Sequence, residues 1–237
     1  MTRRRWIADE ITDNRAALTG AHAAHLSRAL RARVGQEFEV ACGDVVRRAR
    51  VARVCDERVE FELGQEIASS ATAPVTLLLA VFKFDRLEWA IEKCTELNVT
   101  SIVPVIARRT EKHLAQAAER RVERWRRIVR EAAEQSRRST VPTVASPVKL
   151  ADALSTTAEL RIVLSEAERE AQMSDVLRAR PGLPSLALAN GPEGGWAAEE
   201  LQLFENAGWI SASLGATILR AETAVIAALA IVRAELD

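Results

Sequence analysis

The stretch LALANGPEGGWAAEEL, from Leu186 to Leu201, runs from an apolar segment into three glycines within five residues and then into a helix-like pattern. Glycine permits backbone angles and close approaches that a Cβ would block, and a simple turn needs only one glycine. A strand followed by a glycine loop and a helix start leaves backbone N–H groups available to a ligand. The stretch therefore predicts a ligand-binding loop at the end of a strand, with a plain glycine-rich connector as the alternative.

Around this loop, the chain from Pro74 onward alternates apolar runs with amphipathic segments. VTLLLAVF is continuously apolar, as expected for a strand covered on both faces of a sheet. Residues 86–99 place apolar side chains on one helical face, and residues 220–236 are apolar around most of a helix. The alternation predicts a parallel α/β sheet. Loops after its strands, within 164–169, 190–196 and 213–223, are expected to meet at one edge of that sheet.

The N-terminal part of the chain has a different pattern. EFEVAC, VVRRARVARV and RVEFEL are short β-rich segments with polar alternation, bounded by glycines, and they predict a small β-barrel. The stretch GQEIASSATAP is rich in small and polar residues and is interpreted as the boundary. We therefore expect a β-barrel domain over residues 1–70 and an α/β domain over residues 71–237.

Composition narrows the function classes. The 33 basic and 33 acidic residues give a net charge of +0, so nucleic-acid binding would require local clusters of charge. Cys42, Cys55 and Cys94 are odd in number and lack C-x-x-C spacing, which argues against a disulfide framework and predicts a cytoplasmic protein. No apolar run is long enough for a membrane span. His22 and His25 lie at helical spacing, but without ligands at suitable spacing we expect no metal.

Four motifs occur in order along the chain: FKFDRLEWAIEKCTELNVTSIVPV, EAAEQSRR followed by VP, NGPEGGW and LGATILRAETA. Together they resemble the RsmE family of 16S ribosomal RNA uridine-N3 methyltransferases, of the SPOUT class. HAAHLSRALRARVGQEFEV resembles the opening of the PUA-like RNA-binding domain of that family. Neither G-x-G-x-x-G nor G-x-x-x-x-G-K-[ST] is present. Two positions depart from the family pattern, because Thr217 replaces an arginine and Asn190 replaces an apolar residue.

The resemblance implies a C-terminal trefoil-knot (SPOUT) methyltransferase domain after a PUA-like β-barrel, and a homodimer. It implies methyl transfer from S-adenosyl-L-methionine to N3 of a uridine in 16S rRNA of the 30S ribosomal subunit. Methylation of another RNA site and a catalytically silent RNA-binding assembly factor are the alternatives. The implied cofactor-binding residues are Leu164, Asn190, Gly191, Pro192, Gly194, Gly195, Leu214, Gly215, Ile218 and Leu219. A valine at Gly194 is expected to abolish cofactor binding, because it would require backbone angles that only glycine tolerates.

Arg220 is the main catalytic candidate, because its guanidinium fork can face a carbonyl oxygen or a phosphate and remains protonated. Glu222 or Glu193 is expected to orient Arg220 or accept the proton, and the sequence does not choose between them. The alternative roles are structural: Glu193 caps the following helix, and Arg220 forms a salt bridge. The candidate RNA-binding residues are Arg3, Arg4, Arg5, Arg28, Lys83, Arg86 and Arg138.

Overall fold

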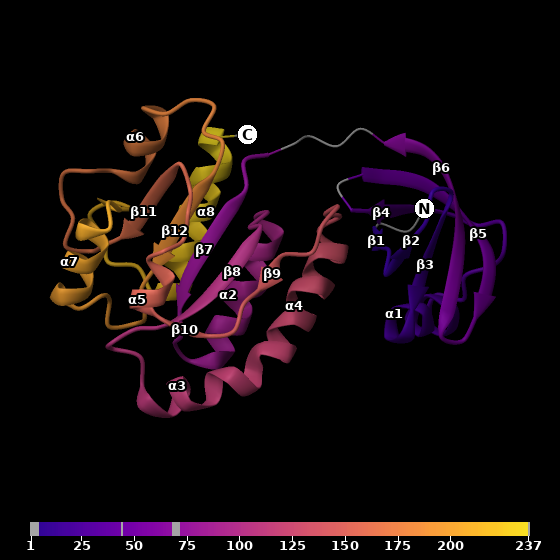
Figure 1. Ribbon diagram of the computed structural model, residues 1–237, viewed down its shortest axis with the longest axis horizontal. Helices are drawn as coiled ribbons and strands as arrows, with labels where there is room; N and C mark the ends of the chain where they lie inside the picture. Colours follow the sequence, from indigo (N-terminus) through magenta and orange to yellow (C-terminus); the bar gives the residue numbers. More distant parts are fainter. Residues whose placement is uncertain (1–4, 44, 68–71, 237) are drawn as a thin grey trace. The chain divides into compact units, whose positions relative to one another are not determined.

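The computed structural model describes residues 5–43, 45–67 and 72–236 (Figure 1). The chain divides into two compact units. One comprises the N-terminal strands together with Glu131–Val141, and the other comprises Thr72–Arg130 and the chain from Pro142 onward. Arg3 and Arg4 lie outside the described residues.

The N-terminal unit is built on a six-stranded mixed sheet in the order β1-β4-β5-β6-β3-β2, in which β1 and β4 are parallel and the other neighbours antiparallel. Its elements are β1 (Trp6–Ile7), β2 (Glu10–Ile11), β3 (Arg15–Thr19), α1 (Gly20–Ala24), a π-helical turn (His25–Ala29), β4 (Glu37–Cys42), β5 (Val45–Cys55) and β6 (Arg58–Ile67). Apolar side chains alternate inward along β5 and β6, and they form a core with Trp6, Phe38 and Phe61.

Two strands of this sheet are longer than the sequence suggested, since β5 has 11 residues and β6 has 10. Strand β6 continues through Gly64 to Ile67, so the first part of the expected boundary segment is strand. The structural reason is local. A Cβ at Gly64 would lie 2.9 Å from the Arg48 carbonyl oxygen, beside a register shift between β5 and β6. The glycine therefore fits a bulged part of the strand, where a close backbone approach excludes a side chain.

The second unit contains a seven-stranded sheet in the order β10-β8-β7-β12-β11-β13, with β9 also paired to β8. All pairs of neighbouring strands in the described part of this sheet are parallel, which confirms the predicted parallel α/β sheet. The strands are β7 (Val75–Ala80), β8 (Ser101–Ile106), β9 (Thr143–Val144), β10 (Val148–Lys149), β11 (Leu160–Leu164), β12 (Leu186–Asn190) and β13 (Ile210–Ala212).

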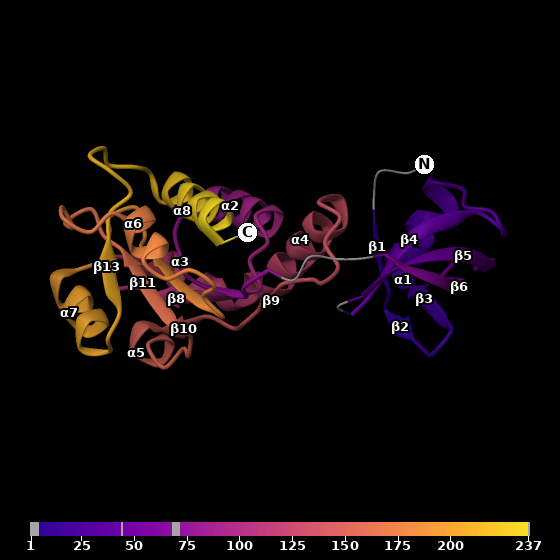
Figure 2. The same cartoon turned by 90° about the horizontal axis from the view of Figure 1, so that it is seen from above.

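Helices cover both faces of the parallel sheet. In Figure 2, α2 and α8 lie over one face, and α5 and α7 lie on the other. The helices are α2 (Phe84–Glu96), α3 (Lys112–Ala118), a 3-10 turn (Glu119–Arg121), α4 (Val122–Gln135), α5 (Leu150–Ala153), α6 (Met173–Arg178), α7 (Ala198–Asn206) and α8 (Ala221–Leu236). None of the described helices is long and apolar enough to cross a membrane.

Helix α8 begins immediately after Arg220, where the Arg220 carbonyl accepts the backbone N–H of Ala224 at 2.8 Å. It buries Val225, Leu229 and Val232 and packs against α2 and α6. At its other end, Arg233 donates to the carbonyls of Leu97 and Asn98, at 3.0 and 3.1 Å. These bonds tie the last turn of α8 to the turn after α2.

Candidate functional site

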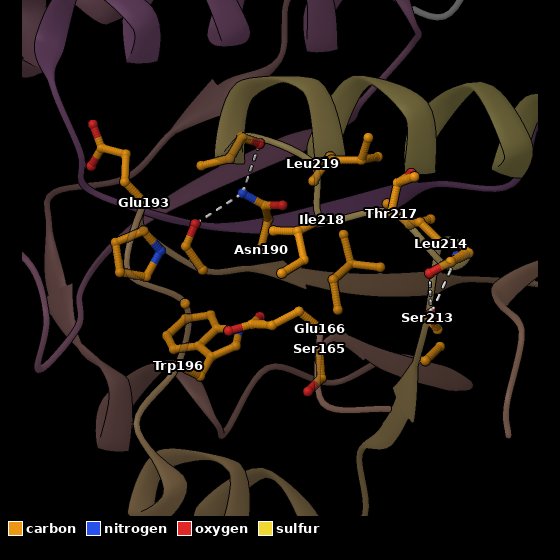
Figure 3. A pocket seen from close by; sticks show the side chains of 18 residues that line it. Ser165, Glu166, Asn190, Glu193, Trp196, Ser213, Leu214, Thr217, Ile218 and Leu219 are labelled. Carbon is orange, nitrogen blue, oxygen red and sulfur yellow. Dashed lines mark hydrogen bonds between the residues drawn. The ribbon is translucent and has the colours of Figure 1, made fainter. Parts of the chain in front are cut away.

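Three loops meet in a cavity of about 110 Å³ at the carboxyl edge of the parallel sheet (Figure 3). They follow β11, β12 and β13, as expected for loops after neighbouring parallel strands. Nine of the ten predicted cofactor-binding residues line this cavity, and Gly194 is the exception. The nine are Leu164, Asn190, Gly191, Pro192, Gly195, Leu214, Gly215, Ile218 and Leu219.

Backbone hydrogen bonds join the loops after β11 and β13. The Ser213 N–H donates to the Ala171 carbonyl at 2.8 Å, and the Met173 N–H donates to the Ser213 carbonyl at 3.0 Å. The Ser213 hydroxyl lies 3.2 Å from both the N–H and the carbonyl oxygen of Gly215. Two segments about forty residues apart in the chain therefore form one side of the cavity.

Asn190 joins the glycine loop to the last helix. Its side chain is buried, and its amide nitrogen donates to the carbonyl oxygens of Gly191 and Ala221, at 3.1 and 3.2 Å (Figure 3). An apolar residue, as in the family pattern, cannot make these bonds. The departure at this position thus has a structural role at the end of β12.

Gly195, rather than Gly194, has the backbone conformation that favours glycine. Gly195 has a φ of 68°, and a Cβ there would lie 2.2 Å from the Glu166 Oε1. Gly194 is not among the residues with positive φ, and a Cβ there would meet only the flexible Arg109 side chain, at 3.3 Å. The steric reason given for a valine at Gly194 is therefore wrong and applies to the next glycine.

Trp196 is a lining residue that the sequence analysis missed. Its indole packs edge-on against Phe204, with ring centroids 4.9 Å apart. Its Nε1 is buried and has no hydrogen-bond partner among the described residues. A Cβ at Gly191 would lie 3.3 Å from this nitrogen, so the glycine leaves room for the indole edge. Buried donors are normally satisfied, and this one has no acceptor within the described chain. The signal in the sequence was an aromatic residue directly after the glycines.

The turn that follows β8 also holds the glycine loop in place. The buried Glu200 accepts the backbone N–H of Ala197 at 2.9 Å and that of Arg108 at 2.8 Å. Arg109 donates to the Gly194 carbonyl at 2.5 Å. Glu200 is thus the carboxylate that caps the start of α7, and the sequence alternative that gave this role to Glu193 is wrong.

The three catalytic candidates lie in different surroundings. Glu193 lines the cavity but is exposed, and its carboxylate points away from the centre in Figure 3. Arg220 is exposed and is not a lining residue, although Leu219 and Ala221 on either side of it are. Glu222 is buried on α8, with its Oε1 3.6 Å from Nη1 of Arg86 on α2. Its recorded ion pair is therefore with Arg86 and not with Arg220.

Two further carboxylates lie in the loop after β11. Glu168 accepts the backbone N–H groups of Arg169, Glu170 and Ala171 at 2.8 to 3.1 Å, and these bonds lower its pKa below the usual value. Glu166 lines the cavity and extends toward the loop that carries Trp196 (Figure 3). Glu168 therefore shapes the loop, whereas Glu166 faces the ligand space.

The candidate RNA-binding residues differ in availability. Lys83, before α2, is exposed, and Arg28 is exposed beside Asp56 at 3.1 Å. Arg5 donates to Glu39 at 3.1 Å and to the Arg137 carbonyl oxygen. Arg86 is half-buried, and Arg138 is 8% exposed. Among the described residues, no group of three or more His, Cys, Asp or Glu side chains is arranged to hold a metal ion.

Comparison with known proteins shows which class of protein this chain resembles. Residues 69–233 match the family model of the RNA methyltransferase domain. "Ribosomal RNA small subunit methyltransferase E" of Synechocystis sp. is 34% identical over 233 residues, covering 97% of this chain and 76% of that protein. The enzyme of the same name from Bacillus subtilis is 28% identical, covering 90% and 87%.

Two solved structures share the fold across the whole chain. The small-subunit methyltransferase E from Neisseria gonorrhoeae, bound to S-adenosyl methionine, has a TM-score of 0.85 at 30% identity and covers 98% of this chain and 97% of its own. A methyltransferase from Legionella pneumophila, in complex with the same cofactor, has a TM-score of 0.83 at 27% identity, with 99% and 98% covered. This chain belongs to the ribosomal RNA small subunit methyltransferase E family, which confirms the predicted family.

Proposed function

We propose that this protein transfers a methyl group from S-adenosylmethionine to N3 of a uridine in the 16S rRNA of the small ribosomal subunit. The observation that carries the proposal is the cavity itself. Three loops of a chain in this family converge on a glycine-walled space that contains a buried, unpartnered indole N–H. Names of relatives support the rRNA substrate and the cofactor, and the family resemblance supports the uridine N3 position.

The residues that line the cavity are of types suited to binding S-adenosylmethionine. Gly191 and Gly195 bring the backbone close to the ligand space, which the Trp196 side chain also lines. Leu164, Leu214 and Leu219 also line the cavity, and main-chain donors and acceptors of such residues are suited to recognising an adenine ring. When bound, S-adenosylmethionine supplies a methyl group that its sulfonium already activates. The protein then has to orient the two reactants and stabilise the charge that develops on the uracil.

Arg220 is proposed to stabilise that charge. It lies at the N-terminus of α8, where the helix dipole disfavours a cation, so a structural benefit does not explain an arginine here. Its exposed side chain has no ion pair or hydrogen bond recorded within the described chain. For the N3 proton, Glu193 and Glu222 are both candidates. Glu193 lines the cavity with its carboxylate turned away from the centre, and Glu222 faces Arg86.

The rest of the proposal rests on the family resemblance. We propose that the N-terminal unit is a PUA-like RNA-binding domain, that the loops around α8 form a trefoil knot, and that the protein is a cytoplasmic homodimer. The bonds of Ser213 to the loop after β11 and of Asn190 to α8 hold these segments together. Arg5, Arg28 and Lys83 are proposed to contact RNA together with Arg3 and Arg4. Arg86 and Arg138, which are more buried, are weaker candidates.

Mass spectrometry of rRNA nucleosides from a strain lacking the gene tests the activity. Loss of 3-methyluridine, restored by the wild-type gene, supports the proposal. Loss of a different methylated base indicates another RNA site, and no loss indicates a silent assembly factor. The Arg220→Ala gene is the matched complementation control, since it should leave the fold intact and restore little of the modification.

A further inference from the structure

The charged side chains around the cavity all have one sign. Glu166 and Glu193 are the only ionisable residues among those that line it, and no lysine, arginine or histidine of the described chain does so. The nearest arginines in sequence or contact, Arg109 and Arg220, are not lining residues. Through its side chains, the cavity therefore presents a negative potential to whatever it binds.

Glu166 has the placement to act on a ligand. It follows β11 directly, and its Oε1 would lie 2.2 Å from a Cβ at Gly195, so the carboxylate reaches the glycine wall. No ion pair or hydrogen bond to the Glu166 carboxylate is recorded within the described chain. Glu166 is exposed, so its carboxylate keeps its charge in solution and is open to a ligand. Glu88 on α2 differs, because it accepts from Arg121 and Arg124 at 3.3 and 2.8 Å. A carboxylate left uncompensated beside a ligand space is suited to a cationic ligand.

The proposed reaction changes the charge of the cofactor. In that reaction the S–CH3 bond would break with its electrons retained by sulfur, and the N3–CH3 bond would form. The N3 proton would pass to a protein carboxylate, for which Glu193 and Glu222 are the candidates. The sulfonium carries one positive charge, and the thioether product, S-adenosylhomocysteine, carries none at sulfur. A negative cavity therefore binds the reactant more strongly than the product.

We propose that Glu166 makes the cavity selective for the charged methyl donor over its neutral product, and so favours product release. This inference rests on the proposed function, since it assumes that the cavity holds S-adenosylmethionine. A unit charge several ångströms away in a partly solvated site changes affinity by about three- to tenfold. The selectivity is electrostatic and needs no direct contact between the carboxylate and sulfur.

Isothermal titration calorimetry of the full chain with three ligands tests the proposal. S-adenosylmethionine and sinefungin both carry a positive charge at the reacting position, and S-adenosylhomocysteine shares the rest of the molecule without that charge. Glu166→Gln, which keeps the size and removes the charge, should weaken the two cationic ligands about three- to tenfold and leave S-adenosylhomocysteine unchanged. Glu170→Gln removes an exposed carboxylate on the same loop that does not line the cavity, and it should change none of the three.

Equal weakening of all three ligands would overturn the proposal, because it would show that Glu166 contacts a shared part such as the ribose. Unchanged binding of all three would also overturn it while leaving the proposed function intact. If the wild-type chain binds none of them, the proposed function fails and this inference with it. As a second measurement, raising the salt concentration should weaken wild-type binding of S-adenosylmethionine more than that of S-adenosylhomocysteine, and this difference should shrink in Glu166→Gln.

Discussion

The two sheets of this chain differ in whether the charged and polar side chains beside them have partners. In the mixed N-terminal sheet, charged side chains pair with each other: Glu39 accepts from Arg5 at 3.1 Å and from Arg137 at 2.6 Å, and Arg58 bridges Glu10 and Glu60. At the carboxyl edge of the parallel sheet, Trp196 and Glu166 lack such partners within the described chain. The paired charges stabilise the surface of the N-terminal sheet. The groups without partners at the cavity can interact with a bound molecule.

Among the variants that test this difference, Arg220→Ala is expected to have the largest effect, on the rate of methyl transfer. Losing one preorganised donor for developing charge typically lowers turnover by about 10²–10³. Methyl transfer should fall by that amount with little change in melting temperature, because the side chain is exposed. Incorporation of tritiated methyl groups into 30S subunits from a strain lacking the gene measures it. Near-normal turnover, or unfolding of the variant, would show that Arg220 has a structural role, like the arginines that form ion pairs on the N-terminal sheet.

An intermediate effect is expected from Gly195→Val. A side chain at a φ of 68° costs at least about 1–2 kcal/mol, which corresponds to roughly tenfold or more in affinity if the loop must hold this conformation to bind. Calorimetry with S-adenosylmethionine provides the measurement. Gly194→Ala is the matched control on the adjacent residue, where φ is not positive and the neighbour is flexible. Equal loss in both variants would contradict the distinction between the two glycines.

The smallest effect is expected in the N-terminal sheet. Hydrogen bonds from Arg137, and then from Arg5, hold the pKa of Glu39 below its usual value of 4.5. A carboxyl whose pKa is depressed in the folded state stabilises the fold above its unfolded pKa and loses that contribution as the pH falls through the folded value. Glu39→Gln should therefore reduce the free energy of unfolding at pH 7 by no more than about 1 kcal/mol, and the difference should shrink as the pH falls from about 4.5 through the depressed pKa of the folded state.

Hydrogen exchange of the β4 and β5 amides, followed from pH 7 downward, measures this difference. Glu37→Gln is the control on the same strand, because Glu37 lies 3.7 Å from Arg50 and both side chains are more than half exposed. A pH-independent difference between Glu39→Gln and the wild type would show that the charge of Glu39 is not the cause.

Much of the fold followed from periodicity. The final helix was predicted from the apolar pattern of residues 220–236, and the parallel strands were predicted from the alternation of apolar runs with amphipathic segments. The glycine loop was also evident, because strand, glycines and helix start are adjacent in sequence. The family was recognised from four motifs in order, and the comparisons confirm it.

The remaining features depend on contacts between distant residues. Which glycine adopts positive φ is decided by the surrounding loop, and composition alone does not distinguish Gly194 from Gly195. Glu200 rather than Glu193 caps α7 because the turn after β8 brings a second N–H to it. The length of β6 depends on a bulge opposite Gly64 in a neighbouring strand. None of these contacts produces a regular pattern in the sequence.

The hydrogen bonds of the Asn190 amide affect the rate and the entropy of ligand binding. It ties the start of the glycine loop to the first residue of α8, 31 positions later in the chain, while Arg109 holds the Gly194 carbonyl. The loop is therefore ordered before any ligand arrives, and the entropy of fixing it is lost during folding rather than on association. A preorganised loop binds in one step, so the observed association rate should rise linearly with ligand concentration, without the plateau that a slow loop closure would impose.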